Sequence, residues 1–444
     1  MSSKIPPYVI QEILPELIKP ILHCFADSKE KCREIAIEIL SSLIGRCVEP
    51  DEFLAYIFPV LVERLDAYDI EGIQNLPEVM RPNPSQRPQV VKSPKEPSEE
   101  LRILLAKFIQ VITEKTSVRS LSPYVQELTS VIRILCMDPN NGEVIITSCK
   151  TMEFLAAKAK ELLFHYSEPL ARSLYTAIVH KSWKVRCASL EALRVVMYIG
   201  VFKYNATIVE GLIGFRDPNV VPIKDFYEPS AKLNYLAMLI NDRSAHVRET
   251  FLNVISDWLL NLPDKYDLET RLIPYLLSGL FDPIPGIREN TFAQIEAIGQ
   301  KYEEEKEKEI REIRQLGFQE PWTCDGIMTY LPLPEPFAKR PRLGARLYFR
   351  QYVRRYLNAI FAELGDWIAS SRLYSSNLLV CLIIFTEDYI TQHLDKFLSC
   401  IYKALIMNSN PKVIENLQTA IKLVGRYVNT DSYMPQVLAA LMVR

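Results

Sequence analysis

The residue types that most often carry out chemistry are few in this chain and widely scattered. Its five histidines show no metal-ligand spacing such as H-E-x-x-H, and they stand at His23, His165, His180, His246 and His393. Its nine cysteines never occur as C-x-x-C, and they stand at Cys24, Cys32, Cys47, Cys136, Cys149, Cys187, Cys324, Cys381 and Cys400. This pattern is typical of buried apolar cysteines in a reducing compartment.

Motifs for phosphate binding and for nucleophilic catalysis are absent from the sequence, and only 14 residues are Gly. His393 follows Glu387 and Asp388 at helical spacing, which admits a metal ligand, although a hydrogen bond in a turn is the favoured interpretation. We therefore expect no catalytic, cofactor-binding or metal-binding residues and no enzyme activity.

One pair of residues does recur with a fixed spacing, and its chemistry is ion pairing. An Asp follows one apolar segment, and an Arg stands six residues later in the next. The pairs are Asp27 with Arg33, Asp242 with Arg248, Asp282 with Arg288 and Asp366 with Arg372, and Arg186 follows His180 in the same way. The Asp is expected to accept from backbone N–H groups that begin a helix. The Arg is expected to reach the Asp of the adjacent repeat, which would make a ladder that fixes the angle between repeats.

The interval between these signatures indicates the elements that position them. The regular intervals are 42 residues from Arg102 to Val144, 42 from Val144 to Arg186, 40 from Arg248 to Arg288 and 42 from Arg372 to Ile414. Three longer gaps contain Pro-rich segments, at residues 66–98, 216–231 and 317–342. Without these segments a single period of roughly 40 residues remains, which is the interval of HEAT and armadillo repeats.

Apolar residues at helical spacing lie on both sides of each signature. The stripes are Leu170, Leu174 and Ile178, then Val185, Leu190, Leu193, Val196 and Met197, and later Leu272, Ile273, Leu276, Leu277 and Leu280. Since one helix pair cannot bury such stripes alone, neighbouring pairs must stack. We expect an all-α fold, a right-handed α-solenoid of about eight HEAT (armadillo-like) repeats with three Pro-rich insertions.

The expected organisation has five parts. They are N-terminal HEAT repeats at 1–65, a Pro-rich insertion loop at 66–98, HEAT repeats at 99–300 with the insertion 216–231, a charged helix extension and Pro-rich loop at 301–343, and C-terminal HEAT repeats at 344–444. The formal net charge of −2 does not call for a nucleic-acid partner. The longest apolar run, Leu378 to Phe385, is too short to span a bilayer, so we expect no membrane partner and a cytoplasmic protein.

Two segments are candidates for a partner surface. Arg346, Arg350 and Arg354 would form a basic stripe on one helix face, with Tyr348, Tyr352 and Tyr356 on a neighbouring face. This stripe is either a protein-binding surface or a plain solvated face, and nucleic acid is disfavoured because an acidic run lies beside it. Trp322 lies on a Pro-rich segment that could dock a partner or merely cover the repeats.

Several stretches resemble a known family more closely than HEAT packing requires. They are HKSWKVRCASLEALRVVMYIG (His180 to Gly200), VISDWLLNLPDKY (Val254 to Tyr266), RLIPYLLSGLFD (Arg271 to Asp282), RPRLGARLYFR (Arg340 to Arg350) and LGDWIASSRLYSSNLLVCLIIFTEDYITQHLDKFL (Leu364 to Leu398). These residues resemble the HEAT repeat-containing axonemal dynein assembly factor family, with good agreement from about residue 170 to 425 and only a compositional likeness before that.

The resemblance implies a cytoplasmic factor that preassembles axonemal dynein arms, with the base of the cilium or flagellum as a second location. The implied partners are dynein intermediate and heavy chains, other dynein assembly factors and chaperones, with no small-molecule substrate. Members of the family are longer, so this chain would be a fragment or a short form. The alternatives are a transport-receptor or phosphatase-type HEAT adaptor, and a tubulin-binding array, which the Asp- and Pro-containing turns disfavour.

Overall fold

The computed structural model describes residues 6–65, 95–200, 236–263, 265–315, 333–366 and 368–442, and every regular element in these ranges is a helix. The chain divides into two compact units, Met1–Phe215 with Val220–Val254 and Arg216–Asn219 with Ile255–Arg444. The division falls within helix α14 (Ala245–Asn261). Each unit is described separately below.

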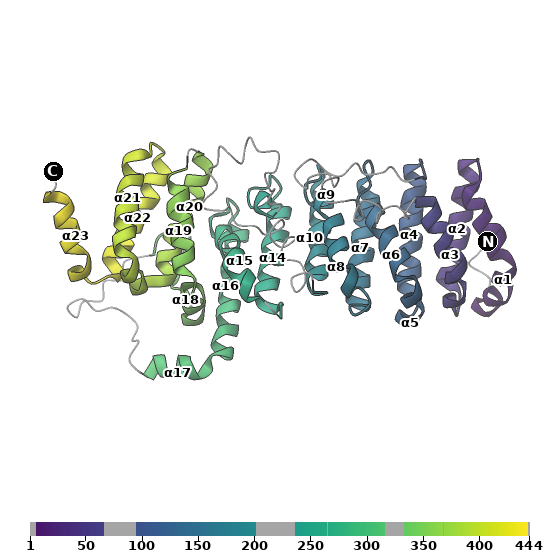
Figure 1. Cartoon of the computed structure of the whole chain (residues 1–444), viewed down its shortest axis with the longest axis horizontal. Helices are drawn as coiled ribbons and strands as arrows, with labels where there is room; N and C mark the ends of the chain where they lie inside the picture. Colours follow the sequence, from purple (N-terminus) through teal and green to yellow (C-terminus); the bar gives the residue numbers. More distant parts are fainter. Residues whose placement is uncertain are drawn as a thin grey trace, which may run out of the picture. The chain divides into compact units, whose positions relative to one another are not determined.

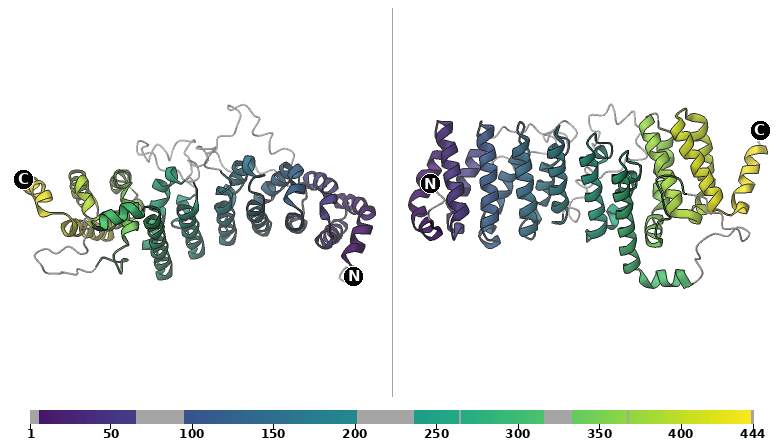
Figure 2. Two further views of the ribbon diagram at one scale, coloured as in Figure 1. Left: turned by 90° about the horizontal axis from the view of Figure 1, so that it is seen from below. Right: turned by 180° about the vertical axis from the view of Figure 1, so that it is seen from behind.

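The first unit consists of paired antiparallel helices in two rows (Figure 1 and Figure 2). One row contains α2 (Glu30–Arg46), α4 (Glu99–Lys115), α7 (Gly142–Lys158) and α10 (Trp183–Met197), each packed on the next. The other row contains α1 (Pro7–His23), α3 (Leu54–Leu65), α6 (Val125–Cys136) and α8 (Ser167–Ser173). Shorter elements are η2 (Cys24–Ala26), η3 (Pro50–Phe53), α5 (Val118–Leu121), η5 (Ser122–Tyr124), η6 (Phe164–Tyr166), α9 (Tyr175–Ile178) and η7 (Ala237–Leu239).

The second unit repeats the same two-row arrangement. One row contains α16 (Pro285–Glu305), α18 (Leu343–Arg350), α20 (Ala369–Thr386) and α22 (Pro411–Tyr427). The other row contains α15 (Tyr266–Ser278), α19 (Val353–Leu364) and α21 (Leu394–Met407). The remaining elements are η8 (Gly279–Phe281), α17 (Glu307–Gln315), η9 (Glu387–His393) and α23 (Thr430–Met442).

The predicted apolar stripes form the core between the rows. In the first unit Leu170, Leu174, Val185 and Leu193 are fully buried, and in the second unit Leu272 and its predicted neighbours are buried as well. Proline occupies the first turn of α1, α16 and α22, where its missing N–H leaves no hydrogen bond unmade. The all-helical repeat fold is thus confirmed, whereas the number of repeats, the handedness and the extent of the insertions stay predictions.

The charged segment 301–314 was predicted to extend a single helix, but it is divided between two helices. Helix α16 ends at Glu305, Lys306 leaves the helical conformation, and α17 begins at Glu307 in a new direction (Figure 1). Ile310 of α17 is 3% exposed. The bend between the two helices thus accompanies the burial of this apolar side chain, although most residues of α17 are charged.

Helices α16 and α18 approach so closely that their backbones touch. A Cβ atom at Gly344 would lie 2.0 Å from the Gly299 carbonyl oxygen, and one at Gly299 would lie 2.5 Å from the Ala345 nitrogen. No side chain fits between these helices, so both positions require Gly for steric reasons.

We predict that Gly344→Ala lowers the unfolding free energy by about 1–3 kcal/mol, because the added methyl group forces the two backbones apart. Gly425→Ala in α22 is the matched control, since nothing lies within 4 Å of its Cβ position, and it should stabilise the helix slightly. Urea unfolding of both variants measures the difference. Equal effects at the two glycines would show that the α16–α18 contact is not tight.

Candidate functional site: the ladder between repeats and the surfaces beside it

Each signature Asp organises the turn that precedes its helix. Its Oδ1 atom accepts a hydrogen bond from the backbone N–H two residues later. The observed bonds are Lys29 to Asp27 at 2.7 Å, Asn140 to Asp138 at 3.0 Å, Ser244 to Asp242 at 2.8 Å, Ile284 to Asp282 at 2.9 Å and Ile368 to Asp366 at 3.3 Å. The carboxylate therefore holds the chain in the turn just before the helix begins.

Each signature Arg closes the same turn, a contact that the sequence alone did not predict. Its Nη1 atom donates to the backbone carbonyl of the residue six positions earlier. The bonds are Arg33 to Asp27 at 2.9 Å, Arg102 to Glu96 at 3.0 Å, Arg186 to His180 at 2.7 Å, Arg248 to Asp242 at 2.7 Å, Arg288 to Asp282 at 2.7 Å and Arg372 to Asp366 at 2.7 Å. Because the acceptor is a main-chain oxygen, the spacing is kept even where His180 or Glu96 replaces Asp.

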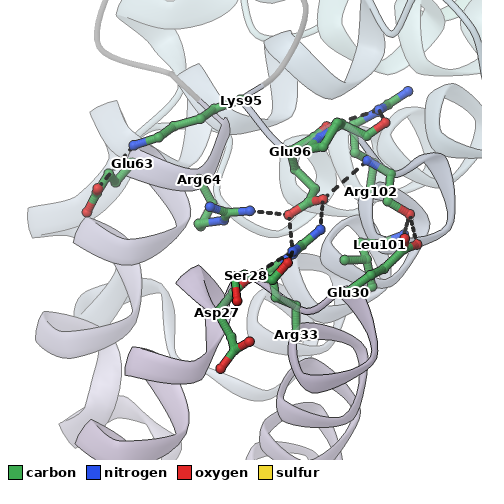
Figure 3. Close-up of polar contacts among 12 residues, drawn as sticks. Asp27, Ser28, Glu30, Arg33, Glu63, Arg64, Lys95, Glu96, Leu101 and Arg102 are labelled. Carbon is green, nitrogen blue, oxygen red and sulfur yellow. Dashed lines mark hydrogen bonds and ion pairs between the residues drawn. The ribbon is translucent and has the colours of Figure 1, made fainter.

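The same guanidinium groups also reach the next repeat in the first unit. Arg186 Nη2 lies 2.7 Å from Asp242 Oδ1, and Arg102 Nε lies 2.6 Å from Asp138 Oδ2. Arg33 donates to both carboxylate oxygens of Glu96, at 3.1 and 3.0 Å (Figure 3). Each of these arginines thus ties its own turn to the turn of the following repeat.

Within the described part of the first unit, the ladder has one gap. Both residues of the expected ion pair are replaced there. Val144 stands where an Arg is expected, and His180 stands where the next Asp is expected. Burial and the nearby Lys181 charge lower the pKa of His180, and its Nδ1 accepts from the Ser182 N–H at 3.0 Å. A neutral imidazole thus replaces the carboxylate in the turn and requires no arginine partner.

Glu96 is a ladder residue that the sequence analysis missed. It falls at the end of the segment predicted as a Pro-rich insertion, yet it is 1% exposed and also binds Arg64 (Figure 3). Its position six residues before Arg102 was the feature of the sequence that could have identified it as a ladder residue. A Glu side chain is longer than Asp, so it can serve Arg33 and Arg64 together.

Glu387 is a second acid that the sequence did not identify as a ladder residue. It is 3% exposed, and its backbone has a positive φ of 50°, which is strained for a residue with a side chain. Arg340 binds it through two bonds of 2.6 and 2.8 Å, and Arg346 binds it at 2.6 Å. These contacts hold Arg340, before α18, and Arg346, within α18, to the end of α20.

Arg346 therefore does not belong to an exposed stripe, in contrast to the prediction. It is 5% exposed, and its Nε donates to the Pro341 carbonyl at 3.0 Å, much as the ladder arginines close their turns. Helix α18 also ends at Arg350 and α19 begins at Val353, so the three predicted arginines share no single helix face. Arg346 does not follow the regular interval between signature arginines, so the sequence did not indicate a repeat there.

The predicted tyrosine face is also internal. Tyr348 and Tyr356 are each 4% exposed, and their burial raises the pKa of both hydroxyl groups. The Tyr352 hydroxyl donates to the buried Glu269 carboxylate at 2.7 Å. These rings join α18 and α19 to α15 rather than presenting a surface.

Arg350 and Arg354 do remain on or near the surface. The Arg350 guanidinium lies 4.9 Å from the centre of the Tyr389 ring, while Arg354 is exposed. Burial, followed by the charges of Arg354 and Lys396, lowers the pKa of His393. We call Arg350, Arg354, Tyr389, His393 and Lys396 the Arg354 surface.

Trp322, the other predicted contact residue, lies outside the described residues.

No group of three or more His, Cys, Asp or Glu side chains in the described ranges could hold a metal ion. The stretch Ala369–Met407 is long and apolar enough to cross a bilayer, which the sequence analysis did not anticipate. However, 72% of its apolar window is buried inside the protein, and Leu378 to Phe385 are all buried. This burial is typical of the central helix of a repeat stack.

Two models of known protein families match this chain. A family model for the HEAT-repeat domain of dynein axonemal assembly factor 5 matches residues 333–443. A model for the TPR repeats of dynein axonemal assembly factor 5-like proteins matches residues 1–81, 73–213 and 230–313. The chain belongs to the dynein axonemal assembly factor 5 family. The resemblance seen in the sequence is confirmed, and it extends over the N-terminal residues as well.

Curated relatives agree with this assignment. Dynein axonemal assembly factor 5 of Xenopus laevis is 31% identical over 440 residues, which are 99% of this chain and 45% of the relative. The Homo sapiens protein is 27% identical over 425 residues, which are 96% of this chain and 43% of the relative. The chain thus spans less than half the length of these assembly factors.

Solved structures show only a distant likeness. An engineered protein is 10% identical with a TM-score of 0.40, covering 95% of this chain and 92% of that chain. Yeast importin-beta (Kap95p) is 13% identical with a TM-score of 0.33, covering 99% of this chain and 57% of that chain. A likeness at this level says nothing about cargo or partners.

We predict that Arg102→Ala destabilises the first unit by about 3–5 kcal/mol, because it leaves the fully buried Asp138 carboxylate without its partner. Arg311→Ala is the matched control, since it removes an exposed ion pair with Glu307 and should cost about 0–1 kcal/mol. Denaturant unfolding of the two variants measures both costs. Similar losses would argue against a ladder that stabilises the stack.

We also predict that Arg102→Val with Asp138→His reproduces the natural Val144 and His180 gap. Each single change should be costly, whereas the double variant should recover about 0.5–3 kcal/mol of the summed loss, because no charge is left unpaired. A double-mutant cycle from urea unfolding measures this coupling. If the stability losses of the two single variants simply add, the Val144 and His180 pair has no energetic advantage over an unmatched replacement.

Proposed function

We propose that this chain is a non-enzymatic HEAT-repeat scaffold for the cytoplasmic preassembly of axonemal dynein arms, and that it is required for motility of cilia or flagella. The observation that supports this most directly is the family match along nearly the whole chain. The described helices supply a long series of turns and helix faces, which suits binding through many weak contacts.

The proposed partners are dynein intermediate and heavy chains, other dynein assembly factors and chaperones. The scaffold would act in the cytoplasm and at the base of the cilium or flagellum. Its ladder residues Asp27, Arg33, Arg186, Asp242, Arg248, Asp282, Arg288, Asp366 and Arg372 would hold the repeats at a constant angle. Partners would then meet a surface of defined shape.

The Arg354 surface is the proposed partner surface of the second unit. Arg354 and Lys396 both lower the pKa of His393, so their positive charges act on one place, and Tyr389 adds an aromatic ring beside them. Aromatic and arginine side chains together are typical of binding hot spots. Trp322, which stands in the Pro-rich segment of the sequence, is a further proposed contact residue.

Deletion of the gene in a ciliated cell should remove dynein arms, and re-expression should restore them. Affinity purification of the tagged chain should recover dynein chains and other assembly factors. Recovery of nuclear cargo or of a phosphatase catalytic subunit in their place would instead support the transport-receptor or phosphatase-scaffold alternative.

Within that assay, Arg354→Glu with Lys396→Glu should reduce recovery of dynein chains, because the surface would repel an acidic partner. Lys403→Glu with Lys412→Glu is the matched control, since both lysines are exposed in the same unit and the change in charge is identical. Thermal melting of both variants checks folding. Equal recovery from the two variants would remove the Arg354 surface from the proposal.

A further inference from the structure

Two turns of the first unit, residues 179–184 and 242–246, are joined by two contacts. Arg186 bridges them by its 2.7 Å bond to Asp242. The Trp183 and His246 rings stack with centroids 4.8 Å apart and planes 25° from parallel. We call Val179, Lys181, Trp183, Lys184, Arg243 and His246 the Trp183 surface.

The Trp183 surface exposes apolar area in a fixed conformation. Trp183 is 40% exposed and Val179 is 45% exposed, although both are large apolar residues. The stacked His246 ring supports one face of the indole, and Lys184 Nζ lies 6.0 Å from its centre. An aromatic ring that is held in place loses little conformational freedom on binding, which favours its use as an anchor.

The charge of the Trp183 surface is strongly positive. Lys181, Lys184 and Arg243 are all exposed. Asp242 is the one acid within the two turns, and its Oδ1 already accepts from Arg186 and from the Ser244 N–H. The three cations therefore have no carboxylate in these turns to offset them.

The corresponding turns of two earlier repeats are acidic. Glu99 and Glu100 are exposed at the start of α4, and Glu143 is exposed at the start of α7, whereas the turn at the start of α2 is mixed, with Glu30 between Lys29 and Lys31. HEAT packing itself thus accepts acids at these positions. The change to cations and an exposed Trp at the Trp183 surface is not required by the fold.

We infer that the Trp183 surface binds an acidic segment of a protein partner, with an aromatic or aliphatic side chain that packs on Trp183. Opposite charge would guide the segment to the surface, and the indole would supply the apolar contact. Glu143 of α7 and Glu249 of α14 are exposed as well. They would repel carboxylates and phosphates alike, so the contact with the segment is confined to the three cations and Trp183.

This inference rests on the proposed role as a protein scaffold, but its test uses only purified components. A failure would therefore leave the dynein-arm result unaffected. The probe is a short fluorescein-labelled peptide of Glu residues around one Phe, and fluorescence anisotropy measures its binding to the full chain. Binding should weaken as salt increases, because the attraction is between exposed charges.

The variant Lys181→Glu with Lys184→Glu and Arg243→Glu should lower the affinity about tenfold or more. Trp183→Ala should also weaken binding, and its effect should persist at high salt because the lost contact is apolar. The matched control is Lys107→Glu with Lys150→Glu and Lys160→Glu, which changes the charge of the same unit equally at exposed sites. This control should bind like the unaltered chain, and circular dichroism should show the same melting curve for all variants.

Three results would overturn the inference. The first is that the unaltered chain does not bind the peptide, and the second is that both charge-reversal variants lose affinity equally. The third is that a labelled single-stranded oligonucleotide binds more tightly than the peptide through these same residues. That outcome would reassign the surface to nucleic acid.

Discussion

Each helix pair of this chain has more apolar surface than it can cover, and the neighbouring pair must cover the rest. Leu190, Leu193 and Val196 of α10, for example, are fully buried, and α10 packs on α7 rather than only on its own partner helix. A repeat is therefore unstable in isolation, and the contact between repeats is the element on which the fold depends. The other interactions of the stack must therefore be compatible with the packing of one repeat on the next.

Burial of apolar stripes is not directional, so a further interaction must decide how repeats are oriented. The ladder arginines provide this direction, because one guanidinium binds a carbonyl of its own turn and a carboxylate of the next turn. Arg102 does so with bonds of 3.0 Å to the Glu96 carbonyl and 2.6 Å to Asp138. A planar group with five donors is suited to this double role, and Lys could not fulfil it in the same way.

The repeat around α18 shows how an irregular segment is accommodated. It lacks the usual Asp, and Arg340 and Arg346 instead converge on the strained, buried Glu387. The backbone contact between Gly299 and Gly344 brings α18 against α16. This region uses more polar contacts and a closer backbone approach than the regular repeats, so it depends more on individual residues.

The sequence by itself determined the all-helical repeat fold and the Asp and Arg positions of the signature turns, because these follow from local patterns. Helical spacing of Leu272, Leu276 and Leu280 predicts one buried face, and a constant interval of six residues between Asp and Arg predicts one kind of turn. The family resemblance was also legible in contiguous stretches. The Arg354 and Trp183 residues could be seen in the sequence, but not the surfaces to which they belong.

The tertiary structure alone decided which contacts join residues that are distant in the chain or irregularly spaced. Glu96 and Glu387 became ladder acids only because the folded chain carries them to Arg33 and Arg346. The predicted surface role of Arg346 failed for the same reason, since a charge that pairs in the folded state cannot be distinguished in sequence from a solvated one. Periodicity records which face of a helix is buried, whereas the pairing of charges depends on where other segments arrive.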